Sequence, residues 1–277
     1  MKIRENHPIL DRIKVIAILL FLAWILGRLV ELGERNEYQS TLESFLQNAM
    51  KPVGTTMYIW GGGWDESDST SGIGSTRIGV SPMWKAFADA QDSAYDFTEY
   101  RYEREKGLDC SGYVGWVVYN VFEDVDGQNG YVAKSTEMAK EYADRGWGRL
   151  LENPKEYLPG DIVSMEGHVW ICLGTCADGS VLLVHSSPPG VSVCGTEARN
   201  VGADAQEESI AVQLATEFMT NYFSGWQERY PNRVVGNHYL ENTTVMRWNR
   251  ETMRDAADIQ NRSGEEIIKF LMNQMFE

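Results

Sequence analysis

One cysteine of the sequence lies where its thiol could act as a nucleophile. Cys110 falls at the expected start of a buried apolar helix, in the segment GLDCSGYVGW at residues 107–116. Unpaired backbone N–H groups in the first turn of a helix favour the thiolate and lower the thiol pKa. The same groups could donate hydrogen bonds to an oxyanion. Cys110 is therefore the candidate nucleophile of a covalent hydrolysis.

Two histidines follow this cysteine at a spacing that could supply a base. His168 begins an expected strand, and His185 lies near the end of the next one. Asp178-Gly179 between them indicates a hairpin turn, so the imidazoles fall on neighbouring strands, one or two residues out of register. Side chains so related can share a face of the sheet. We predict that His168 is the base and that His185 orients it. The alternative is that the cysteine and the histidines are only structural.

The elements around these residues are helical first and then extended. The pattern of apolar residues predicts an α+β fold, in which helices precede a meandering sheet. The apolar run that follows Cys110 is consistent with a buried helix or a buried strand. The other expected helices cover residues 33–51, 83–106, 134–145 and 205–230 and part of the tail from 250, and the expected strands cover 161–165, 169–174, 181–186, 191–194 and 243–248.

Several segments between residues 50 and 195 resemble, in order, the motifs of NlpC/P60 cysteine peptidases. Residues 109–114 (DCSGYV) are similar to the nucleophile motif of that family. Residues 168–174 (HVWICLG) resemble the histidine strand of the family. Residues 158–163 (LPGDIV) resemble the strand that precedes it. Residues 184–187 (VHSS) resemble the strand with the third catalytic residue, and 58–62 (YIWGG) the aromatic-glycine element that lines the active site.

The resemblance implies a papain-like core with a central antiparallel sheet and no cofactor. It implies hydrolysis of peptide bonds in the stem peptides of peptidoglycan, often between D-glutamate and a diamino acid. Tyr58 would approach the oxyanion or the substrate, Asp109 would meet a substrate amine, and Ser111 would join them in substrate binding. A core tyrosine and a helix cap are the alternatives for Tyr58 and Asp109.

Two regions depart from the pattern of the family. The interval from the aromatic-glycine element to the cysteine is longer than usual, so we expect an insertion at 64–106 that lies near the cleft and could gate it. Residues 196–277 form a C-terminal extension without a matching motif. These departures affect the prediction of the substrate more than the prediction of cysteine-dependent hydrolysis. A wall amidase of the cysteine, histidine-dependent type and a non-catalytic wall-binding protein held at the membrane are the alternatives.

The N-terminal segment 15–32 is apolar enough for a membrane anchor. Basic residues precede it and acidic residues follow it, which places the N-terminus in the cytoplasm and the remainder outside. We therefore expect a cytoplasmic tail at 1–14, a single-pass anchor at 15–32 and an extracytoplasmic catalytic domain at 33–277. A cleaved signal peptide, which would give a secreted protein, and a core helix of a cytosolic protein are the alternatives.

Charge and cysteine spacing exclude other classes of protein. The net charge of −15 opposes binding to nucleic acid, which requires a basic surface. The four cysteines lack the paired spacing of a structural zinc site, so no metal is expected. Export would permit a disulfide between Cys176 and Cys194, and separate thiols are the alternative.

Overall fold

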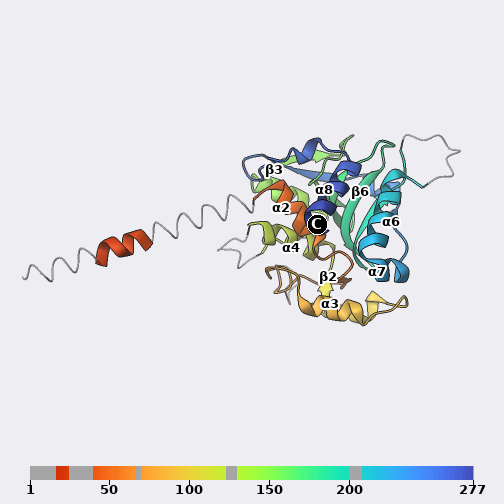
Figure 1. Cartoon of the computed structure of the whole chain (residues 1–277), viewed down its shortest axis with the longest axis horizontal. Helices are drawn as coiled ribbons and strands as arrows, with labels where there is room; N and C mark the ends of the chain where they lie inside the picture. The colour runs from red at the N-terminus through yellow and green to blue at the C-terminus, as the bar shows by residue number, and fades with distance from the viewer. Residues whose placement is uncertain (1–16, 25–39, 66–69, 123–129, 200–207, 277) are drawn as a thin grey trace, which may run out of the picture. The chain divides into compact units, whose positions relative to one another are not determined.

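The computed structural model describes residues 17–24, 40–65, 70–122, 130–199 and 208–276 (Figure 1). The chain divides into two units, Met1–Gln39 and Ser40–Glu277. In the first unit, residues 17–24 are helical. The predicted tail 1–14 and the other residues of the predicted anchor 15–32 lie outside the described residues. Among the helices that are described, none has both the length and the apolar character required to cross a membrane.

The second unit is built on a mixed sheet of nine strands in its described part. Their order is β2-β1-β7-β6-β5-β4-β9-β3, and β8 pairs with β7. The pairs β1–β2 and β7–β8 are parallel and the others are antiparallel, which confirms the α+β class and the antiparallel centre. The strands are β1 (Met57–Tyr58), β2 (Gly107–Leu108), β3 (Gly148–Glu152), β4 (Ile162–Met165), β5 (His168–Thr175), β6 (Val181–Ser187), β7 (Gly190–Thr196), β8 (Val234–Val235) and β9 (Thr244–Trp248).

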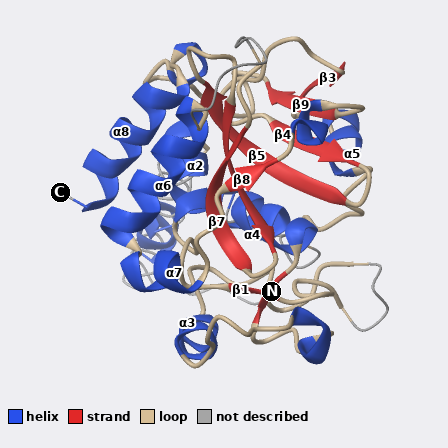
Figure 2. Cartoon of the chain, turned by 90° about the vertical axis from the view of Figure 1, so that its right-hand side faces the viewer, coloured by secondary structure: helices blue, strands red, loops and turns tan. Residues whose placement is uncertain are grey.

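Helices pack against the sheet to form the main hydrophobic core. Figure 2 shows α2, α6 and α8 together on one side of the strands. The helix α4 contacts α2, β5 and β6, so it lies at the centre of this core. The helices of the unit are α2 (Leu42–Met50), α3 (Pro82–Asp89), α4 (Cys110–Phe122), α5 (Met138–Asp144), α6 (Ile210–Tyr222), α7 (Ser224–Arg229) and α8 (Gly264–Phe276).

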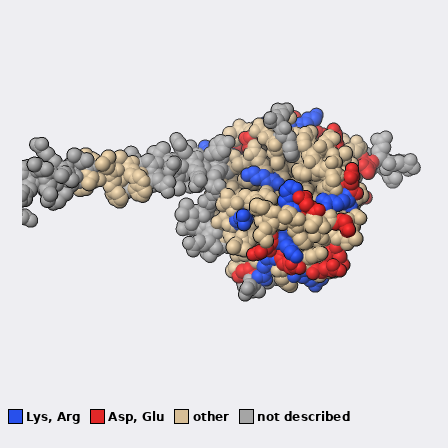
Figure 3. Space-filling model, turned by 60° about the horizontal axis from the view of Figure 1, so that its bottom comes forward, with Lys and Arg blue, Asp and Glu red and all other residues tan. Residues whose placement is uncertain are grey.

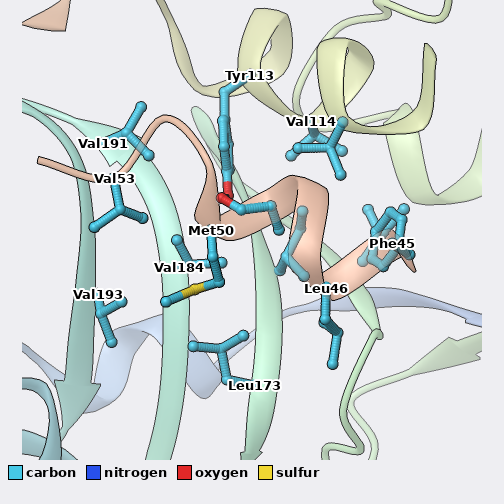
Figure 4. Packing of buried hydrophobic residues seen from close by; sticks show 14 of the residues in the cluster. Phe45, Leu46, Met50, Val53, Tyr113, Val114, Leu173, Val184, Val191 and Val193 are labelled. Carbon is cyan, nitrogen blue, oxygen red and sulfur yellow. The ribbon is translucent and has the colours of Figure 1, made fainter. Parts of the chain in front are cut away.

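The apolar run after Cys110 is the helix α4, so the strand alternative is wrong. Apolar residues occur on all sides of α4 and nearly all of them are buried, as expected for a helix enclosed by its neighbours. The hydroxyl of Tyr113 donates to the carbonyl oxygen of Ala49 in α2 at 2.7 Å. Figure 4 shows the Tyr113 hydroxyl beside Met50. This contact fixes α4 against α2 and thereby fixes the position of Cys110.

A smaller hydrophobic cluster includes alternate residues of β4, β5 and β6. Tyr157, Trp170 and Leu183 belong to it, together with Val245 of β9. The nearby Arg247 forms a buried ion pair with Asp161, in which Nε and Nη2 lie 2.8 and 2.6 Å from the two carboxylate oxygens. The predicted C-terminal extension therefore contributes the strands β8 and β9 to the same sheet, and the arginine of a buried ion pair.

The prediction of one helix over 83–106 is wrong beyond α3. The side chain of Asp92 accepts a hydrogen bond from the backbone N–H of Ala94, and that of Asp96 accepts one from Thr98. Such local bonds compete with the helical pattern. The only helical turn of this stretch after α3 is the 3₁₀ turn Phe97–Tyr100.

The helical prediction for 205–230 is confirmed over most of the described residues 208–230, with one break. They form two helices, α6 and α7, with Phe223 in a non-helical conformation between them. Strand β3 was not predicted, although its alternating pattern GRLLE pairs with β9 along its whole length.

The Cys176–Cys194 disulfide that export would permit is not formed, and the alternative of separate thiols is confirmed, because all four cysteines are free. Cys176 packs in the main core, whereas Cys194 packs in the smaller cluster. The two side chains therefore belong to different hydrophobic clusters, which explains why no bond joins them.

Candidate active site

The first turn of α4 is held by its own residues and by a glycine loop. Asp109 Oδ1 accepts hydrogen bonds from the Gly112 backbone N–H at 2.7 Å and from the Ser111 hydroxyl at 3.0 Å. Asp109 therefore caps the helix, which is the alternative that the sequence left open. The loop after β1 packs directly on this turn, since a Cβ at Gly112 would lie 2.0 Å from the carbonyl oxygen of Gly62. A larger residue at 112 would displace the helix start.

The Cys110 thiol is enclosed at this position. Burial raises the pKa of the thiol to about 12, and the nearby Asp109 carboxylate adds to the effect. Backbone N–H groups of Val169, Ser111 and Cys110 itself act in the opposite direction. The expected influence of the helix start is thus present, but burial outweighs it. Cys110 is a neutral thiol at neutral pH in this state, contrary to the predicted low pKa.

The two histidines form a hydrogen-bonded pair, as their spacing predicts. His168 Nε2 and His185 Nδ1 are 3.0 Å apart, and the rings meet edge to face with centroids 5.1 Å apart. Burial lowers the pKa of His168 to about 4 and lowers the pKa of His185 well below its usual value. Both imidazoles are therefore neutral at neutral pH. A neutral His168 that donates through Nε2 keeps Nδ1 as an acceptor for a proton.

Cys110 at the start of α4 lies close to β5, the strand that begins with His168. The backbone of Val169, the residue after His168, lies near enough to the sulfur to lower the thiol pKa. The resting site thus contains a neutral thiol beside the strand that begins with a neutral imidazole. In such a pair the base removes the proton as the sulfur attacks, and no charge separation is needed beforehand.

Tyr58 lies beside the nucleophile and is supported by the insertion. Burial raises the pKa of Tyr58, and the closeness of Cys110 and then of Asp109 raises it further. The ring of Phe97 meets the Tyr58 ring edge to face at 5.4 Å. The hydroxyl of Tyr95 donates to the Tyr58 carbonyl oxygen at 2.6 Å. The described residues of the predicted insertion 64–106 therefore form part of the wall next to Cys110.

Ser111 links the helix start to the insertion. Its hydroxyl donates to Asp109 and accepts a hydrogen bond from Trp64 Nε1 at 3.1 Å. The Ser111 hydroxyl already donates its hydrogen to Asp109. This geometry gives Ser111 a role in positioning the start of α4 against Trp64. Substrate binding by Ser111 stays a prediction.

Two residues of the C-terminal extension belong to the site and were missed. The ring centroid of Tyr239 lies 5.5 Å from that of His168 and 5.8 Å from that of His185. Burial raises the pKa of Tyr239 to about 12. Arg233 is close enough to His185 to disfavour its protonation. Neither residue is part of a motif, and both are far from the histidines in sequence, so no local signal identifies them.

The described residues include no group of three His, Cys, Asp or Glu side chains placed to hold a metal ion. The groups that lie near one another are a buried thiol, two hydrogen-bonded imidazoles and the backbone N–H groups at the start of α4. This set can perform acyl transfer through a thioester.

No family model matches the sequence, and the comparisons with curated proteins and with solved structures found no match either.

Proposed function

We propose that this protein is a cysteine hydrolase that cleaves peptide bonds in the stem peptides of peptidoglycan. Cys110 is the nucleophile, His168 the base and His185 the residue that orients the base. One observation supports the proposal most strongly: His168 is hydrogen-bonded to His185 at 3.0 Å, and the next residue along β5 lies near enough to the Cys110 sulfur to lower its pKa. The sequence resemblance to NlpC/P60 peptidases supports the choice of substrate.

The geometry supports the following sequence of steps. His168 takes the thiol proton while the sulfur bonds to the substrate carbonyl carbon, and the carbonyl oxygen becomes an oxyanion. The backbone N–H of Cys110 and the Tyr58 hydroxyl are the candidate donors to that oxygen. The C–N bond then breaks and the proton passes from His168 to the leaving amine. Water, deprotonated by His168, finally cleaves the thioester and restores the thiol.

The surface charge is compatible with a substrate that contains an amine. The chain has a net charge of −15, and Figure 3 shows acidic and basic side chains interspersed on the face that it presents. Asp109, next to the nucleophile, supplies a carboxylate that could meet the ammonium group of a stem peptide in addition to capping α4. We propose cleavage between D-glutamate and the diamino acid that follows it.

A position outside the cell membrane would give such an enzyme access to its substrate. The apolar segment 15–32, with basic residues before it and acidic residues after it, supports a single-pass anchor with the catalytic unit outside. A cleaved signal would give a secreted enzyme with the same active site.

Mass spectrometry of purified wall fragments tests the proposal directly. The fragments are incubated with the intact protein or with Cys110→Ala, and the new termini are identified. We expect free D-glutamate carboxyl groups and free diamino acid amines with the unaltered protein only. New termini at the sugar–peptide amide would indicate an amidase with the same thiol chemistry. No cleavage of any wall amide would contradict the proposal.

A further inference from the structure

A cavity of about 290 Å³ lies next to the histidine pair and is lined in part by His185. The ends of β6 and β7 contribute His185, Ser192 and Cys194 to its lining, and residues 232–239 contribute the opposite wall, which includes Arg233. Neither Cys110 nor His168 lines it, so it is distinct from the space around the thiol.

Arg233 is the unusual feature of this cavity. Its side chain is almost completely buried, with 2% of the residue exposed. Nη2 donates to the carbonyl oxygen of Tyr230, whereas Nε and Nη1 have no hydrogen-bond partner among the described residues. No aspartate or glutamate occurs among the residues that line the cavity. A buried guanidinium without a counter-charge is costly, because burial removes its hydration and nothing replaces it.

We propose that this cavity binds a carboxylate, which pairs with Arg233 beside His185. A guanidinium fits a planar carboxylate better than any other charged partner. A single negative charge balances the single arginine of the lining, whereas a doubly charged phosphate would leave one charge without a partner. The hydroxyl of Ser192 and the imidazole of His238 are further polar groups in the lining that can donate to the bound oxygens.

The bound carboxylate would also act on the histidine pair. Burial lowers the pKa of His185 most, and His168 and then Arg233 lower it further. A negative charge at Arg233 would cancel that contribution, so His185 would become a better acceptor for the proton shared with His168. Arg233 is thus a binding residue for the carboxylate and a positioning residue for the base.

Binding is tested on the intact, unaltered protein with acetate, its neutral analogue acetamide, and chloride at equal ionic strength. We expect acetate to raise the melting temperature in a saturable manner, because a ligand that binds the native state stabilises it, and we expect no such effect of acetamide or chloride. Equal effects of acetate and acetamide would overturn the proposal. This measurement involves no variant and no hydrolysis, so its result is independent of the proposed function.

Variants then assign the binding to Arg233. Arg233→Gln should weaken acetate binding by roughly thirtyfold or more, the usual consequence of removing one partner of a buried charge pair. Arg233→Lys should retain part of the affinity. Arg229→Gln is the matched control, since Arg229 lies outside the cavity lining and donates to Ala88 and Gln91. Unchanged acetate affinity in a folded Arg233→Gln protein would contradict the assignment.

Kinetics distinguish two sources of the carboxylate and rest on the proposed function. If the carboxylate belongs to the substrate, acetate should compete with a stem peptide that has a free carboxylate, but not with its amidated form. If a free acid is the ligand, acetate should change the turnover of both peptides equally. Either result is consistent with a carboxylate site. Absence of hydrolysis would count against the proposed function and would leave the binding result intact.

Discussion

Two buried arginines close to the same sheet differ in how their charge is balanced. Arg247 in β9 pairs with both carboxylate oxygens of Asp161 and donates to the carbonyl oxygen of Glu156. For the side chain of Arg233, beside β8, the described residues supply a single hydrogen-bond acceptor, the carbonyl oxygen of Tyr230. The first region is complete without a ligand, whereas the second has donors that nothing in the described part of the chain satisfies. We infer that the first arginine holds the fold together and that the second binds something from outside.

The histidine pair belongs to the second region. His185 lines the cavity with Arg233, and Tyr239 packs against both imidazoles. Polar groups that natural selection places in such an incompletely paired environment usually serve a function at a cost in stability. The contrast predicts that changes near Asp161 reduce stability, and that changes near Cys110 and His185 reduce activity instead.

The largest expected effect is the loss of hydrolysis in Cys110→Ala. Removal of a covalent nucleophile should lower the rate of wall cleavage by several orders of magnitude and leave the fold intact. Cys172→Ala is the matched control, because Cys172 is also a buried free thiol but lies in the smaller hydrophobic cluster. Rates measured on wall fragments should separate the two variants. A folded Cys110→Ala protein with most of its activity would show that the mechanism is wrong.

The next effect concerns stability and compares the two arginine regions directly. Asp161→Asn leaves Arg247 buried without a counter-charge and should lower the free energy of unfolding by about 3–5 kcal/mol. Arg233→Met removes a buried cation for which the described residues supply no counter-charge, so it should raise the free energy of unfolding, by about 1 kcal/mol or more. Urea unfolding followed by circular dichroism measures both. A larger loss for Arg233→Met than for Asp161→Asn would reverse the comparison.

The histidines should differ from each other in activity. His168→Ala removes the proton acceptor and should lower kcat/KM by about 10²–10⁴-fold, the usual contribution of a general base. His185→Asn should cost less, about 10–100-fold, because the amide oxygen can still accept a hydrogen bond from His168 and hold its ring. Steady-state kinetics on a stem peptide provide both values. A greater loss for His185→Asn would exchange the two roles.

The smallest effect is a pH dependence of stability from the same pair. Because burial lowers the pKa of His168 to about 4 from its usual 6.5, the unfolded chain binds more protons than the native one between these values. Stability should therefore fall as the pH decreases through this window, by about 1–2 kcal/mol near pH 5 for His168 alone. The double variant His168→Gln, His185→Gln should lose this part of the slope. Unfolding curves near pH 7 and pH 5 give the change in stability with pH for the unaltered protein and for the double variant. The same change in both proteins would contradict the prediction.

The sequence predicts the residues that lie in contiguous motifs and misses those that do not. Cys110, His168 and His185 could be placed because helix starts, hairpin turns and strand alternation are local patterns, and the 3.0 Å contact between the histidines confirms their predicted relation. Tyr239 and Arg233 reach the same site through the pairing of β8 and a 3₁₀ turn near the C-terminus. Such long-range packing leaves no periodic signal in the sequence.

The thiol pKa shows a related limit. The sequence correctly indicates the N–H groups at the helix start, but it gives no measure of how deeply Cys110 is buried. Burial makes the largest contribution to the thiol pKa and raises it. The sequence therefore predicts the wrong direction for the shift in the pKa of Cys110. The error in the helix over 83–106 has the same origin, because side chains such as Asp96 form local hydrogen bonds that the apolar pattern does not reveal.

The position of β9 has a consequence for how the protein is made. β9 comes after all the other strands in the sequence, yet it lies between β4 and β3 in the sheet and pairs with both. During synthesis, β4 must therefore wait with one unpaired edge until residue 248 has emerged, and exposed strand edges invite association with other chains. A chain cut short before β9 would also lack Arg247, so Asp161 would be buried alone. The sheet that carries the histidine pair can thus be completed only after residue 248 has been produced.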